Sequence, residues 1–125
     1  MKTKFTSGEW VARKSRTGVT TIQHNEQGFL IATIAGIDEK LANAKLIAAA
    51  PDMIKKLMHT YLCLQIMSRN SVAFAVETDF LRAGLRNAIS EALGIGGEEV
   101  QSWCEGASMD YKKHNGWEAI KKATT

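Results

Sequence analysis

The sequence has little of several residue types that mark specialised proteins: one proline, two cysteines and three histidines among 125 residues, with 7% aromatics. No apolar run approaches the roughly 18–20 residues that cross a membrane. The N-terminal segment MKTKFTSGEW has no apolar stretch of the kind found in signal peptides. We therefore expect a cytoplasmic protein that does not engage a membrane. Cys63 and Cys104 form no CxxC pair, which argues against a structural zinc site.

The sequence also lacks a catalytic constellation. His24, His59 and His114 fall in different segments, and no HxxxH or HExxH spacing occurs. The glycine-rich run at residues 94–97 follows an expected helix, whereas phosphate-cradling loops follow a strand and open a helix. These absences predict a protein that is not an enzyme and that carries no catalytic residue, metal or cofactor.

What is present is typical of a globular domain: 45% hydrophobic residues, 23% charged residues and a net charge of +3. We expect one domain over residues 1–125 with an α+β fold. Its parts are a three-stranded antiparallel meander over 8–36, helices over 38–93 and a helical tail over 98–125. Within the meander, the apolar run 29–35 is expected to be the central or most buried strand.

Capping residues and apolar periodicity divide the helical part. Asp38 is expected to cap a helix over 38–50 that covers one face of the sheet. Pro51 opens a second helix, since proline suits a first turn. A third helix over 72–93 has Ser71 as N-cap and Gly94 as C-cap, and it pairs with the second helix as a hairpin. Its expected apolar stripe comprises Val76, Phe80, Leu81, Leu85, Ile89 and Leu93. Gly84 on this helix predicts a close helix approach.

Two clusters of cations are candidate ligand sites. Arg82 and Arg86 stand four residues apart on one helical face, and we expect them to form an anion or nucleotide cradle with Phe80 and Asn87. The alternative is a pair of ordinary ion pairs to nearby carboxylates such as Asp79. The second cluster, Arg13 and Arg16 with Lys14, lies in the first β turn, where a solvated turn is the alternative interpretation.

One segment of the sequence resembles a known group of proteins. The run ANAKLIAAAP at 42–51, followed by Asp52-Met53-Ile54 and Leu57, together with SGEW at 7–10, resembles a broad group of small bacteriophage and prophage accessory proteins. The resemblance covers residues 7–57. By analogy with phage proteins of similar size, it implies a role in the host cytoplasm during infection, as an antagonist of host defence.

Two mechanisms for such an antagonist are open at this point. The leading one is sequestration of a small nucleotide signal, such as a cyclic nucleotide or an ADP-ribose-type ligand, by a non-enzymatic sponge. The alternative is a protein–protein inhibitor of a host defence complex such as a CRISPR effector. We also expect a homo-oligomer, because the apolar helical faces and the methionines Met53, Met58 and Met67 exceed what a small sheet can bury.

Overall fold

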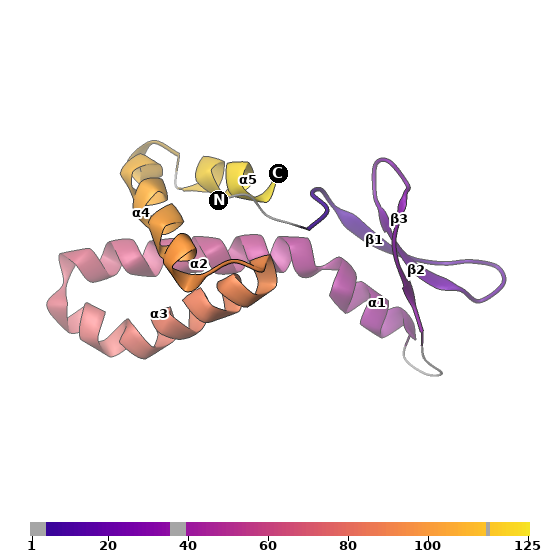
Figure 1. Ribbon diagram of the computed structural model, residues 1–125, viewed down its shortest axis with the longest axis horizontal. Coiled ribbons are helices and arrows are strands. Elements are labelled where there is room, and N and C mark those ends of the chain that lie inside the picture. The colour runs from indigo at the N-terminus through magenta and orange to yellow at the C-terminus, as the bar shows by residue number, and fades with distance from the viewer. Residues whose placement is uncertain (1–4, 36–39, 115) are drawn as a thin grey trace. The chain divides into compact units, whose positions relative to one another are not determined.

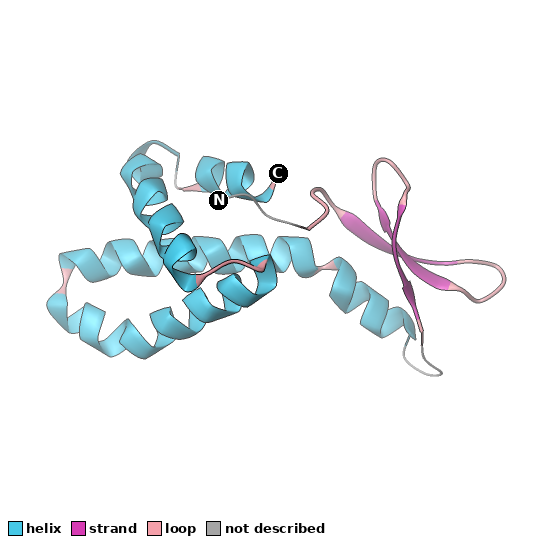
Figure 2. Ribbon diagram, viewed as in Figure 1, coloured by secondary structure: helices cyan, strands magenta, loops and turns pink. Residues whose placement is uncertain are grey.

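The computed structural model describes residues 5–35, 40–114 and 116–125 (Figure 1). The strands come first and the helices follow, as Figure 2 shows, which confirms the expected α+β order. The chain divides into two compact units, Thr6–Met53 and a helical unit formed by Ile54–Thr125 together with Phe5. The boundary falls within the first turn of the second helix, and the expectation of a single domain stays a prediction. The expected cap Asp38 lies outside the described residues.

The first unit is a meander of β1 (Trp10–Lys14), β2 (Thr20–His24) and β3 (Leu30–Ile34) with the helix α1 (Lys40–Ala48). All neighbouring strands are antiparallel, and the order is β1-β2-β3. α1 contacts all three strands, and its Ala44 is fully buried. The helix therefore covers the sheet as expected.

The central strand is β2, which corrects the expectation for β3. Its residues Thr20, Ile22 and His24 are buried, whereas Leu30 of the edge strand β3 is 59% exposed. The reason lies in the topology, because a meander places its second strand between its neighbours whichever strand is most apolar.

The second unit contains α2 (Ala50–Asn70) from Ile54 onward, α3 (Val72–Leu93), α4 (Gly97–His114) and α5 (Trp117–Thr124). The predicted caps are confirmed. Pro51 lies in the first turn of α2, Ser71 accepts a hydrogen bond from the Phe74 N–H at 3.2 Å, and Gly94 ends α3 with φ +66°. One apolar core joins the four helices: Ile54, Met58, Tyr61 and Leu62 of α2, Ile89 and Leu93 of α3, Val100, Cys104 and Ala107 of α4, and Ile120 and Ala123 of α5.

The expected apolar stripe of α3 is wrong in its first half. Ile89 and Leu93 are buried, but Val76 is 73% exposed and Phe80 is 92% exposed. Phe80 and Ile89 are nine residues apart, and nine residues are two and a half helical turns, so their side chains leave α3 on opposite sides. The stripe read from the sequence therefore joined two different faces of the same helix.

The close approach predicted at Gly84 is absent from the described chain, since a Cβ atom there would meet no heavy atom within 4 Å. A different glycine is tightly packed. Gly116 has φ +70°, and a Cβ atom on it would overlap the side chain of Leu62. This glycine lets the chain turn from α4 into α5 against the core.

The two cysteines are free thiols, with Cys104 in the core and Cys63 half-buried on α2. Burial raises the pKa of the Cys104 thiol to about 11. Cys104 is thus more buried than Cys63, although the sequence around Cys104 is the more polar of the two.

Candidate anion-binding site

Three helices of the second unit surround a small polar cavity. Its volume is about 130 Å³, and α2, α3 and α4 line it with Tyr61, Gln65, Asp79, Arg82, Arg86 and Gln101. The cavity forms because Arg82 and Arg86 lie on the core-facing side of α3, where Ile89 continues the same face two turns further on. The structure therefore brings the predicted arginine pair together at one site.

Arg82 is held by a network inside the chain. Its Nη1 donates to Oε1 of Gln65 at 2.7 Å, which links α3 to α2. Its Nη2 donates to the carbonyl of Ala75 at 2.7 Å, and its Nε donates to Oγ1 of Thr78 at 3.1 Å. The Arg82 side chain is only 17% exposed, and Asp79 lies 3.7 Å away. Three of its five N–H donors are thus engaged, and its Nη2 also forms an ion pair with Oδ1 of Asp79, which confirms the alternative interpretation for this arginine.

Arg86 is held far less tightly. The hydrogen bond shown for its guanidinium runs from Nη1 to Oε1 of Gln101 on α4, at 3.4 Å. This distance is longer than the roughly 2.7–3.2 Å of ordinary N–H···O hydrogen bonds. Arg86 is therefore the arginine of the pair that is better able to turn its donors toward a ligand.

Tyr61 and Gln65 complete the polar wall from α2. The Tyr61 hydroxyl accepts a hydrogen bond from Nε2 of Gln65 at 3.2 Å. Burial raises the pKa of Tyr61 above its usual value, against the opposing effect of the Arg86 and Arg82 charges. The hydroxyl therefore stays protonated at neutral pH and can donate a hydrogen bond to an anion.

The other predicted site residues do not join this cavity. Phe80 is two residues from Arg82, a spacing that directs side chains to different sides of a helix, and its ring is 92% exposed. Asn87, seven residues from Phe80, shares the exposed side with it. Arg13 and Arg16 belong to the β1–β2 region of the other unit and are exposed.

The glutamines and the tyrosine of the cavity were missed in the sequence. Tyr61 and Gln65 stand four residues apart on α2, a spacing that places them on one face. This spacing could have been used to predict the site, because two polar residues on the apolar face of α2 indicate a polar contact with the next helix. Gln101 carries no comparable signal, since its position is fixed by the packing of α4.

A second polar cluster was also missed, at His59, Cys63 and Tyr111. The Cys63 Sγ lies 3.9 Å from His59 Nε2 and 3.4 Å from the Tyr111 hydroxyl. The hydrogen bond with Cys63 raises the pKa of Tyr111. His59 and Cys63 stand one turn apart on α2 and Tyr111 comes from α4, so these contacts link the two helices.

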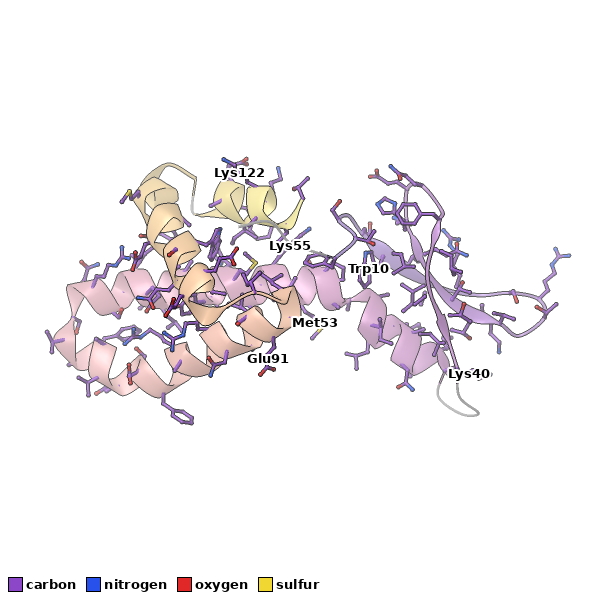
Figure 3. All side chains as sticks on the ribbon, viewed as in Figure 1. Trp10, Lys40, Met53, Lys55, Glu91 and Lys122 are labelled. Carbon is purple, nitrogen blue, oxygen red and sulfur yellow. The ribbon has the colours of Figure 1, made fainter. Side chains whose placement is uncertain are left out.

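An open groove larger than the arginine cavity lies between α4 and α5. It has a volume of about 480 Å³ and a mostly apolar floor with Trp103, Ala107, Ala119 and Ala123, beside Glu118 and Lys122. Lys122 is labelled on α5 in Figure 3. Among the residues that the structure describes, no three His, Cys, Asp or Glu side chains cluster as metal ligands would. Within the same residues, no helix has the length and apolar character needed to cross a membrane.

Comparison with known families places the chain among phage proteins. The family model described as Salmonella phage P22 protein Y8K6 matches residues 1–96, which is most of the chain. The chain belongs to this family. The phage origin inferred from residues 7–57 is thereby confirmed, and the protein is a phage-encoded accessory protein. The match includes all three strands, α1, α2 and α3 with both arginines, and it ends where α4 begins. No curated protein and no solved structure matches the chain.

Proposed function

We propose that this phage accessory protein works by binding and not by catalysis, and that it antagonises host defence by sequestering a small nucleotide-type signal. The observation that carries the proposal is the convergence of Arg82, Arg86 and the Tyr61 hydroxyl on one cavity. Guanidinium groups bind phosphate through paired, charge-assisted hydrogen bonds, which are stronger in a partly dehydrated site.

The size of the cavity defines how such a ligand binds. Pockets that enclose a whole drug-sized ligand measure about 300–1,000 Å³, whereas this cavity measures about 130 Å³. One phosphate group is therefore the part of a nucleotide that enters, and the sugar and base lie outside on the helical surface. Phe80 is not the ring on which the base stacks within one chain, because its side chain leaves the opposite side of α3.

Isothermal titration calorimetry tests the proposal. The panel comprises cyclic di- and trinucleotides, cyclic ADP-ribose isomers and inorganic phosphate. At least one nucleotide is expected to bind with a Kd below about 10 μM, equivalent to roughly −7 kcal/mol, and phosphate is expected to compete with it. If no member of the panel reaches this affinity, sequestration of these signals is wrong.

Arg86→Ala is the sharpest variant, because Arg86 has one weak hydrogen bond to lose. We expect it to weaken nucleotide binding by about tenfold or more, the loss of about 1.4 kcal/mol. Arg82→Ala is expected to weaken binding as well, but it also removes the link between α3 and α2. Lys45→Ala is the matched control, since it removes one exposed positive charge from α1 in the other unit. Equal losses from Arg86→Ala and Lys45→Ala would indicate attraction by net charge alone.

The alternative, inhibition of a host defence complex by direct protein contact, is favoured by the groove between α4 and α5. Its apolar floor and charged edge suit a protruding side chain from a protein partner. Ala119→Arg fills this groove with a bulky cation and leaves the arginine cavity unchanged. A stoichiometric complex with a purified defence effector that Ala119→Arg abolishes, with a silent calorimetric panel, would establish this function instead.

A further inference from the structure

α3 is apolar on two opposite sides, and only one of them has a partner in the described chain. The covered side includes Ile89 and Leu93 in the core. The uncovered side carries a row of residues at four-residue steps, Val76, Phe80, Gly84 and Ala88, which stay within about 120° of the helix circumference because each step turns by about 40°; Val72 and Ala92 lie beyond the two ends of the row. All six are exposed, and Val72 and Phe80 are 82% and 92% exposed. A helix of a small protein that is apolar on both sides ordinarily packs on both sides.

The order of residue sizes along this row is informative. Val76 and Phe80, nearer the N-terminus of α3, are large, and Gly84 and Ala88, nearer its C-terminus, are small. A two-fold axis that passes between Phe80 and Gly84 reverses this order in a second copy. Each large side chain near the axis then faces a small one: Phe80 faces Gly84 of the second copy, and Val76 faces Ala88. Such self-complementarity is what an isologous interface requires.

The polar residues beside the row are also complementary across the two-fold axis. Glu77 and Asn87 are both exposed, and the same axis places Glu77 opposite Asn87 of the second copy. The Asn87 amide can donate a hydrogen bond to the Glu77 carboxylate there. Glu91, labelled on α3 in Figure 3, lies on this side too, but it is more than two turns from the axis. No pair of like charges meets at the centre of this arrangement.

The charges on this side of α3 also distinguish a second copy from other occupants. The ionisable residues there are the carboxylates Glu77 and Glu91, because Arg82 and Arg86 lie on the core-facing side. Anionic membrane surfaces and nucleic acids are repelled by such a face. The row itself is apolar, and it is complementary to the same row of a second copy that runs in the opposite direction.

We propose that the exposed row of α3 is a homodimer interface, in which two α3 helices pack antiparallel about a two-fold axis between Phe80 and Gly84. The glycine allows the two helices to approach closely, because its missing side chain leaves space for the Phe80 ring. α3 has 22 residues, a length of about 33 Å at 1.5 Å per residue, which offers several turns for the contact. This inference does not depend on the anion site, which uses the other side of the helix.

Sedimentation equilibrium of the full chain tests the proposal. The protein is expected at twice its 13.7 kDa chain mass at micromolar concentration and to dissociate on dilution. A species of 13.7 kDa at about 100 μM, where contacts weaker than roughly −5.5 kcal/mol fail, would overturn it. So would a chain that stays monomeric and uses Phe80 to bind a different protein.

Three variants test the pairing itself. Phe80→Ala is expected to weaken dimerisation at least tenfold, because it empties the space above Gly84. Gly84→Phe is expected to weaken it as well, because two phenylalanines then meet where one fits. The double variant Phe80→Ala with Gly84→Phe restores a large residue opposite a small one and is expected to recover the wild-type dissociation constant within about threefold.

We expect these variants to leave the single chain undisturbed, since Phe80 is exposed and a Cβ atom on Gly84 meets no heavy atom within 4 Å. Circular dichroism of each variant at low concentration verifies this. Non-specific association of apolar surface gives the opposite result for Gly84→Phe, because added apolar area then tightens the dimer. A tighter Gly84→Phe dimer would therefore contradict the proposal.

Discussion

Helices α2 and α3 run in opposite directions as a hairpin joined at Ser71 (Figure 1). Its two ends, the tip at Ser71 and the base at the C-terminus of α3, differ in what covers their apolar side chains. At the base, Ile89 and Leu93 pack with α4 and α5 in one core. At the tip, Met67, Val72 and Val76 are 52%, 82% and 73% exposed. The same helix thus contributes to the core at one end and carries uncovered apolar surface at the other. The comparison indicates that stability resides at the base, while the tip and the exposed side of α3 are available for recognition.

The largest test of this difference compares two truncations on α3. Ile89 is fully buried, so Ile89→Ala is expected to lower the free energy of unfolding by about 2–5 kcal/mol. Val76→Ala removes a mostly exposed side chain, and its effect is expected to stay within about 0.5 kcal/mol. Urea unfolding followed by circular dichroism measures both, at a concentration low enough to keep the chain monomeric. Equal losses would show that the tip is packed.

The pH dependence of stability gives a second test of the base. Burial raises the pKa of Cys104 from 9.0 to about 11. Because the folded-state pKa is the higher one, the unfolded state loses the proton first. The contribution of this thiol is therefore fully present below about pH 9 and is lost as the pH rises to about 11, a loss of about 2–3 kcal/mol.

Urea unfolding from about pH 8 to about pH 11 measures this loss. Cys104→Ala is expected to remove most of the decline, while Cys63→Ala, at the half-buried cysteine, is expected to retain it. Part of the decline in unfolding free energy is expected to persist in both variants, because burial raises the pKa of Tyr61 too. An unchanged decline in Cys104→Ala would show that the buried thiol is not its cause.

The sequence predicted what depends on local chemistry. The positions of Pro51, Ser71 and Gly94 could be assigned because each cap is decided by its own side chain and a few neighbouring backbone groups. The antiparallel meander was predictable for the same reason, since short turns leave neighbouring strands few other ways to pair.

The sequence did not predict which apolar residues share a face over a long helix. A small drift in spacing, from Val76 through Leu81 to Ile89, crosses half the circumference of α3, and only the packing of α4 and α5 shows which side is covered. The cavity was likewise predictable only in the part that one helix contributes. Its arginine pair could be predicted from one helix, but Gln65 and Gln101 join it from two others.

The smallest predicted effect concerns the cap at the tip. Ser71 accepts a hydrogen bond from the Phe74 N–H, and substitution of such a cap by alanine costs about 1 kcal/mol. With little packing to hold the first turns of α3, we expect Ser71→Ala to accelerate amide hydrogen exchange at residues 74–78, while amides near Ile89 keep their protection. Thr60→Ala is the control, because Thr60 is an exposed helix-interior residue and alanine favours helix there. Faster exchange along the whole of α3 would mean that tip and base open as one unit. Protection of residues 74–78 that rises with protein concentration would instead show the second copy covering the tip.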